Sequence, residues 1–152
     1  MPGHSRRAAF VVAMLAASWS APALAQAGSG LTPDIARAVN LQMRAGRPVD
    51  SCGAPVTPRI QRVDLNGDGT DEVFVLIPGT CEGGIAGGYL TLLVRAPGGG
   101  WSSNLGFPAG SYRILPRRRG GYPDIEIALP GPCAPVWGWN GQRYHLVRRC
   151  PS

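Results

Sequence analysis

The clearest pattern of apolar and polar positions is a nearly continuous apolar run at residues 72–77, with the sequence EVFVLI. A run of this kind is typical of a central strand that is buried on both faces. At residues 124–129, apolar Ile and Leu alternate with Asp, Glu and Ala, which predicts a strand with one buried and one solvated face. Further strand-like runs occupy residues 89–95, 101–107 and 111–115, and the segment RRRGG at residues 117–121 is expected to form a loop tip.

Residues 32–45 have a helical period instead. Thr32 is a suitable N-cap residue, and Pro33 suits the first position of a helix. Apolar residues return every three or four positions after it, and Gly46 is expected to end the helix. The pattern therefore predicts one amphipathic N-terminal helix that packs on a sheet through its apolar stripe.

The strongest hairpin signal lies near the end of the chain, where an Asn-Gly dipeptide at residues 140–141 separates two strand-like runs. This dipeptide favours a two-residue type I′ turn. Such a turn would set Trp139 opposite Gln142 and Trp137 opposite Tyr144. The three aromatic side chains would then share one face, and we expect that face to belong to the core.

Two segments of the chain resemble each other. Residues 71–81 (DEVFVLIPGTC) and 123–133 (PDIEIALPGPC) align without a gap, and each contains a strand, a Pro-Gly turn and a cysteine. Together with the patterns above, this repeat predicts a mainly β fold of the α+β class. We expect a small antiparallel β domain at about residues 59–149, built from two blade-like β units, with the N-terminal helix packed on it.

The first 25 residues have the features of a signal peptide. Arg6 and Arg7 precede a short apolar run at residues 8–19, and a small-x-small motif at residues 23–25 precedes Gln26. The apolar run is too short to span a bilayer, which takes about 20 residues. We therefore expect a mature chain of residues 26–152 that forms a single domain and is periplasmic or secreted, and not an integral membrane protein.

Four cysteines lie in the predicted mature chain, and an even number in an oxidising compartment favours two disulfides over metal binding. No C-x-x-C spacing is present. Of the three possible connectivities, we favour Cys81–Cys133 with Cys52–Cys150, because Cys81 and Cys133 occupy equivalent positions in the repeat.

Charge gives limited information about partners. The chain has 15 basic residues, all arginine, and nine acidic ones, and cleavage before Gln26 would remove two of the arginines. This modest excess does not require nucleic acid, and it favours a protein or an anionic envelope polymer as partner. Arg117, Arg118 and Arg119 are candidates for anion binding because guanidinium groups match carboxylates and phosphates, although such a run is more often only solvated.

Residues 64–72 (DLNGDGTDE) have the spacing of a calcium-binding loop. Oxygen-bearing side chains fall at the first, third, fifth and ninth positions, and a glycine at the sixth permits a sharp turn. The alternative is a simple Asn-Gly/Asp-Gly turn before a strand. The expected ligands are the side chains of Asp64, Asn66, Asp68 and Glu72 with the carbonyl of Thr70.

The segment DLNGDGTDEVFVLI, residues 64–77, resembles the calcium loop and strand of FG-GAP and VCBS-type repeats. In those families the motif builds propeller blades and adhesive extracellular domains, so the resemblance implies a structural calcium ion in an exported protein. The families usually have aspartate at the ninth position, where this chain has Glu72 preceded by Asp71. Either of these acids is a candidate for the closing ligand.

Catalytic motifs are largely missing from the sequence. His145 is the only histidine of the predicted mature chain, and neither G-x-S-x-G nor H-E-x-x-H is present. Asp124 and Glu126 lie on one face of one strand, which is more typical of a solvated face than of a glycosidase pair.

We therefore expect an exported, non-catalytic binding or interaction domain of the cell envelope with a structural calcium loop. The alternative function is a periplasmic inhibitor or immunity protein that acts on a cell-wall hydrolase.

Overall fold

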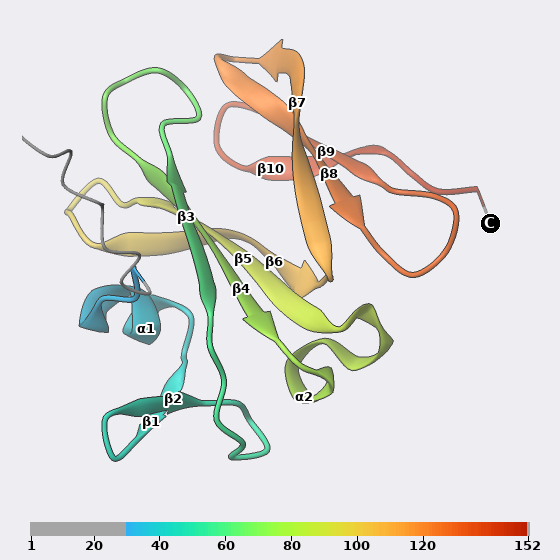
Figure 1. Ribbon diagram of the computed structural model, residues 1–152. Coiled ribbons are helices and arrows are strands. Elements are labelled where there is room, and N and C mark those ends of the chain that lie inside the picture. Colours follow the sequence, from blue (N-terminus) through green and yellow to red (C-terminus); the bar gives the residue numbers. More distant parts are fainter. Residues whose placement is uncertain (1–29, 152) are drawn as a thin grey trace, which may run out of the picture.

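Two four-stranded antiparallel sheets form most of the computed structural model, which describes residues 30–151 (Figure 1). The predicted signal peptide, residues 1–25, lies outside the described residues. The first sheet contains, in hydrogen-bonded order, β3 (Arg59–Val63), β4 (Glu72–Pro78), β5 (Gly88–Arg95) and β6 (Trp101–Pro108). The second contains β7 (Ser111–Arg119), β8 (Tyr122–Ala128), β9 (Val136–Trp139) and β10 (Tyr144–Arg148), again as neighbours in chain order.

Each sheet is thus a meander, and the two similar segments of the sequence occupy the same place in it. Residues 71–81 contribute β4 and residues 123–133 contribute β8, and each of these is the second strand of its sheet. The mainly β, α+β fold expected from the sequence is confirmed.

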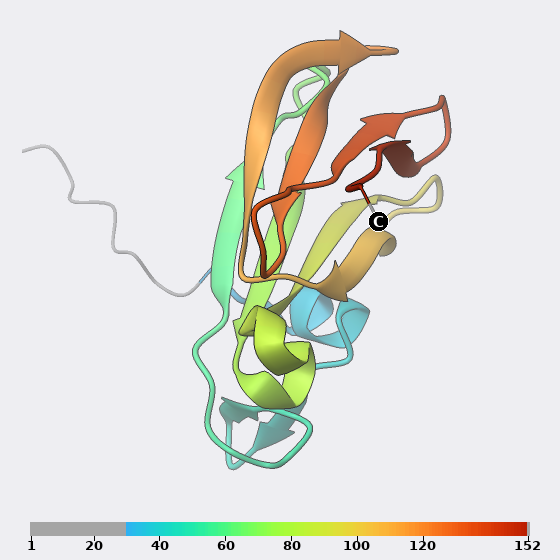
Figure 2. The same cartoon turned by 90° about the vertical axis from the view of Figure 1, so that its right-hand side faces the viewer.

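The first sheet is covered on both faces (Figures 1 and 2). One face packs against the second sheet, where the ring of Phe74 stacks on that of Tyr112 with centroids 4.1 Å apart. The other face packs against the N-terminal segment, including Ile35. All residues of β4 from Glu72 to Ile77 are buried as a result, which confirms the central strand expected from the apolar run.

The N-terminal helix is shorter than predicted. Helix α1 spans only Pro33–Ala38, and the following residues form a small hairpin of β1 (Gln42–Arg44) and β2 (Arg47–Val49). Asn40 has a positive φ of 54°, which stops a right-handed helix. Gly46 does not cap the helix: with φ of 74° it forms the turn of the β1–β2 hairpin, after Ala45 with φ of 47°.

The register of the terminal hairpin also differs from the prediction, because Tyr144 pairs with Trp139 and not with Trp137. The side-chain oxygen of Asn140 accepts hydrogen bonds from the N–H groups of Gln142 and Arg143, both at 3.0 Å, which lengthens the turn. Since the register moves by two residues, the aromatic side chains still share one face. Tyr144 is fully buried on that face, and Trp137 is half-buried.

The arginine run is not a loop tip. Residues 117–119 belong to β7, and the turn that follows is made by Gly120 and Gly121, with positive φ of 54° and 86°. Alternation along the strand therefore separates Arg118 from its two neighbours.

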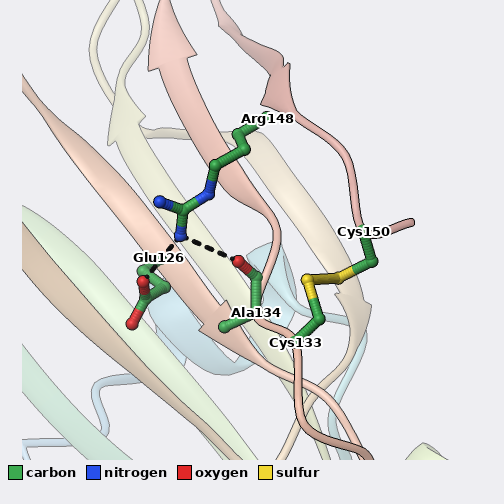
Figure 3. Close-up of a disulfide and its surroundings, with 5 residues drawn as sticks. All are labelled: Glu126, Cys133, Ala134, Arg148 and Cys150. Atoms are coloured by element: carbon green, nitrogen blue, oxygen red, sulfur yellow. Dashed lines mark hydrogen bonds and ion pairs between the residues drawn. A yellow bond between two sulfur atoms is a disulfide. The ribbon is translucent and has the colours of Figure 1, made fainter.

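The four cysteines form two disulfides, as predicted, but the favoured pairing was wrong: Cys52 pairs with Cys81, and Cys133 pairs with Cys150. Equivalent positions in the repeat lie in different sheets, so Cys81 and Cys133 are each bonded to a segment near their own sheet instead. The second of these bonds, the C-terminal disulfide, joins the β8–β9 loop to the segment after β10 (Figure 3). Two disulfides indicate an oxidising, exported environment.

A short helical segment, α2 (Thr80–Gly83) followed by the 3-10 turn η1 (Gly84–Ala86), connects β4 to β5. No helix among the described residues is long and apolar enough to cross a membrane.

Replacement of Phe74 by alanine tests the packing between the sheets. The side chain is 1% exposed and stacks on Tyr112, so F74A should reduce the free energy of unfolding by about 3–5 kcal/mol. I85A is the matched control, because Ile85 is 93% exposed and its loss should change stability by less than about 0.5 kcal/mol. Urea unfolding of both variants measures the difference, and equal midpoints would contradict the assignment of the core.

Candidate functional site

The loop at residues 64–72 connects β3 to β4 and is wound around the carboxylate of Asp64. One oxygen of this carboxylate accepts hydrogen bonds from the N–H groups of Gly67 at 2.7 Å and Asp68 at 3.1 Å. Its other oxygen accepts from the N–H of Gly69 at 2.9 Å. Gly67 and Gly69 have positive φ angles of 80° and 84°, so both positions favour glycine.

The next two polar side chains of the loop also accept bonds from its backbone. The side-chain oxygen of Asn66 accepts from the N–H of Asp68 at 2.9 Å, and the carboxylate of Asp68 accepts from the N–H of Thr70 at 2.7 Å. The bond from the amide of Asn66 and the bond from Thr70 both lower the pKa of Asp68. Asp68 therefore carries a negative charge at neutral pH.

Glu72 closes the loop and is 4% exposed. Its carboxylate accepts a hydrogen bond from the N–H of Leu65 at 2.8 Å. Burial raises the pKa of Glu72, the Leu65 bond opposes this, and the negative charges of Asp68 and Asp64 raise it further. Asp71 is exposed, so of the two acids proposed for the ninth ligand position only Glu72 points into the protein.

Two residues of the second sheet hold the loop in place, and the sequence patterns did not indicate this role for either of them. The hydroxyl of Tyr122 accepts a hydrogen bond from the side-chain amide of Asn66 at 2.7 Å and lies 3.4 Å from the carboxylate of Glu72. The guanidinium of Arg118 donates to the carbonyl of Leu65 at 2.7 Å. Both residues are 50 or more positions from the loop residues they contact, so only the fold brings them together.

The donor atoms of the loop suit a hard cation, since they comprise three carboxylates and an amide oxygen. In the described residues, however, Asp64, Asp68 and Glu72 do not form a group whose oxygens all lie within 4.8 Å of one another. The one such group is Asp50, Cys52 and Cys81, and its two sulfurs are joined in a disulfide and cannot act as thiolate ligands. In this structure the side-chain oxygens of Asp64, Asn66, Asp68 and Glu72 accept hydrogen bonds from backbone N–H groups.

A pocket of about 430 Å³ opens beside this loop and is lined by both sheets. Its walls include Asp68, Glu72, Tyr122, Trp139, Asn104 and Gln142. The rings of Tyr122 and Trp139 stack with centroids 4.2 Å apart. The side-chain oxygen of Asn104 accepts a hydrogen bond from the N–H of Tyr144 at 2.9 Å, which links the two sheets at the pocket. The pocket combines aromatic rings, amides and carboxylates, which can contact a polar ligand by stacking and by hydrogen bonds.

Positive charge is scarce on the walls of this pocket. Arg95 lines it, but its guanidinium lies over the ring of Trp101, 3.7 Å from the centroid. In the described part of the chain, the ion pairs join arginines to Asp124 and Glu126 only. Glu72 and Asp68 therefore form no ion pair there.

The three arginines proposed for anion binding are not brought together. Arg118 faces the loop, whereas Arg117 and Arg119 lie on the outer face of the second sheet near Asp124. Asp124 and Glu126, considered as a catalytic pair, are both engaged in ion pairs with arginines. His145 is exposed on β10 and does not line the pocket.

Comparison with protein-family models, with curated proteins and with solved structures finds no match to this chain.

The raised pKa of Glu72 predicts a specific pH dependence in chelator-treated protein. The ordinary pKa of a glutamate is 4.5, and because the pKa of Glu72 is raised, the folded state holds its proton more tightly than the unfolded chain does. The stability gained from this group is therefore present below the unfolded pKa and is lost as the pH rises through the folded pKa. The variant E72Q keeps a side-chain oxygen that can accept the hydrogen bond from the N–H of Leu65, but its amide cannot ionise.

Thermal melts of wild type and E72Q between about pH 4 and pH 7 measure this effect. The variant should become progressively more stable relative to wild type as the pH rises. If the difference in melting temperature between E72Q and wild type does not change with pH, the pKa of Glu72 is not raised in the folded protein.

Proposed function

We propose that this protein is an exported, non-catalytic binding domain of the cell envelope and that a calcium ion in the 64–72 loop stabilises its binding pocket. The two disulfides and the rigid β scaffold support a role outside the cytoplasm. All described cysteines are in disulfides, and the pocket walls carry no histidine, which leaves the usual nucleophile and base pairs without support.

The observation that carries the calcium proposal is the buried carboxylate of Glu72. A buried ionised group is costly unless it is paired or coordinates a metal. Glu72 has one backbone N–H donor at 2.8 Å and the more distant hydroxyl of Tyr122, and two further carboxylates raise its pKa. A calcium ion ligated by Asp64, Asn66, Asp68, Glu72 and the carbonyl of Thr70 would compensate these negative charges.

Calcium in the loop would also act on the pocket. Asp68 and Glu72 belong to the loop and line the pocket, and Tyr122 lines the pocket while it bonds to Asn66 of the loop. Fixing the loop would therefore fix one wall of the pocket and the ring of Tyr122. This coupling supports a binding site whose shape depends on the ion, and pre-organised sites bind more tightly.

A second candidate function is favoured by the loop between β4 and β5. Ile85 is 93% exposed at η1, on a segment anchored by the Cys52–Cys81 disulfide. The N–H of Ser51 donates to the carboxylate of Glu82 at 2.7 Å, which holds the same segment. A rigid loop with an apolar tip supports an inhibitor or immunity protein that inserts Ile85 into a cell-wall hydrolase.

Calcium should raise the melting temperature of the protein if it binds the loop. A ligand that binds only the folded state adds RT ln(1 + [L]/Kd), about 2.7 kcal/mol at 100 times Kd. D68A should abolish this calcium dependence while it costs only about 1 kcal/mol for the lost Thr70 bond. Differential scanning calorimetry with chelator and with millimolar calcium provides the measurement.

D71A is the matched control for D68A, because it removes an exposed acid from the same loop and should keep the calcium response. An unchanged melting temperature of wild type in calcium would refute the ion site. Loss of the response in D71A but not in D68A would show that the ligands are assigned to the wrong residues.

The inhibitor function predicts that stoichiometric protein slows peptidoglycan hydrolysis by a lysozyme-type or amidase-type enzyme. I85D should lose this inhibition, because a charged side chain is costly to bury in an apolar pocket. It should keep the wild-type melting temperature, since Ile85 is exposed. Turbidity assays of cell-wall suspensions measure the rate of peptidoglycan hydrolysis. Full hydrolase activity in the presence of the wild-type protein would exclude the inhibitor function for the enzymes tested.

A further inference from the structure

The outer face of the second sheet carries arginines held over carboxylates. Glu126 of β8 bridges two of them, with Nη2 of Arg113 at 2.7 Å and Nη2 of Arg148 at 2.9 Å. Arg148 also donates to the carbonyl of Ala134 at 3.1 Å, next to the C-terminal disulfide (Figure 3). The disulfide and these bonds fix the position of the Arg148 guanidinium.

Asp124 holds a second pair of arginines on the same face. Nε of Arg119 lies 2.8 Å from one of its oxygens, and Nε of Arg117 lies 3.9 Å from the other. Gly138 of β9 makes room for the ion pair of Arg119 with Asp124: a Cβ at this position would lie 2.6 Å from Nε of Arg119 and 2.8 Å from the Asp124 carboxylate. The missing side chain allows the ion pair to lie flat across the neighbouring strand.

The four arginines of this face, Arg113, Arg117, Arg119 and Arg148, are called the arginine face below. Their four positive charges exceed the two negative charges of the carboxylate partners by two, and the carboxylates are more buried than the arginines. Asp124 is 3% exposed and Glu126 18%, against 72% for Arg117 and 59% for Arg148. Each guanidinium has five N–H donors. The hydrogen bonds described occupy one nitrogen each of Arg113, Arg119 and Arg148, and Arg117 lies 3.9 Å from Asp124 without a hydrogen bond to it, so further donors remain available to a ligand.

Between these arginines lies a hollow of about 290 Å³. Arg117, Arg119 and Arg148 line it together with Asp124, which pairs with two of them, and with the apolar side chains of Leu115, Val136 and Val147. The hollow therefore offers both guanidinium donors and an apolar surface.

We propose that the arginine face binds an acidic polysaccharide, with uronate carboxylates on the guanidinium groups and a sugar ring over the apolar part of the hollow. Guanidinium and carboxylate groups pair with matched, charge-assisted hydrogen bonds. Arg113, Arg117 and Arg119 follow one another along β7, and Arg148 joins them from β10, so a polymer with repeated charges meets several of them at once. The proposal rests on the proposed function only in taking the protein as an exported binding domain, and it does not require calcium.

A polysaccharide fits this surface better than an anionic membrane does. Proteins that bind membrane surfaces combine basic residues with exposed apolar side chains that enter the lipid. The exposed large apolar residues of the described chain are Met43, Ile85 and Leu129, and none of them lines the hollow.

The proposal is tested by measuring the binding of the full mature protein to alginate, a polymer of uronic acids, with isothermal titration calorimetry. Wild type should bind alginate and not neutral dextran. Binding should weaken as sodium chloride rises from about 0.01 M to 0.15 M, because the screening length falls from about 30 Å to 8 Å. R117A/R148A should bind alginate about tenfold more weakly or worse, since it removes two of the guanidinium groups that line the hollow.

R47A/R59A is the matched control, because it removes two exposed arginines from β2 and β3 and leaves the arginine face intact. It should keep wild-type affinity, and melting curves should show all proteins folded. Equal losses in the two double variants, no binding of alginate at low salt, or preference for phosphatidylglycerol vesicles over alginate would overturn the proposal. The titrations are run with and without chelator, so that a failure of the calcium site does not affect this outcome.

Discussion

Strand β4 is buried on both faces, and this constraint determines much of the remaining structure. The second sheet covers one face and the N-terminal segment the other, so the strand has to be apolar along its length. Its first residue, Glu72, is the exception, because it is a buried acid at the end of an apolar strand. The N–H of Leu65 satisfies one carboxylate oxygen, and Tyr122 approaches the other. The buried acid thus links the loop, the strand and the second sheet, and the pocket forms where they meet.

Features that depend on local periodicity could be predicted from the sequence. The apolar run of β4 and the similarity of its segment to that of β8 indicated the central strands and the two related sheets. The helix was predicted too long because a spacing of apolar side chains carries no information on the positive φ of Asn40. The disulfides were predicted, but their pairing was not, since similarity in sequence between Cys81 and Cys133 does not imply proximity in space.

The candidate site could be predicted only in part, for the same reason. The spacing of acids in the 64–72 loop indicated a region of interest, and Gly69 has the positive φ that a sharp turn requires. Tyr122 and Arg118, which hold the loop, come from distant β8 and β7, and no local pattern identifies them. The arginine run was recognised as a charged segment, but its division between two faces follows from the strand that contains it.

The two disulfides cross-link each sheet to its own neighbouring segments and do not join the sheets to each other. The relation between the sheets therefore rests on the apolar core and on polar contacts at the pocket, such as those of Tyr122 with Asn66 and of Asn104 with Tyr144. Contacts of this kind respond to ionisation and to bound cations, whereas disulfides do not. The arginine face lies on one side of the second sheet and the pocket beside the 64–72 loop on the other. The two surfaces therefore differ in what holds them: ion pairs with Asp124 and Glu126 on one side, and hydrogen bonds between the loop and the second sheet on the other.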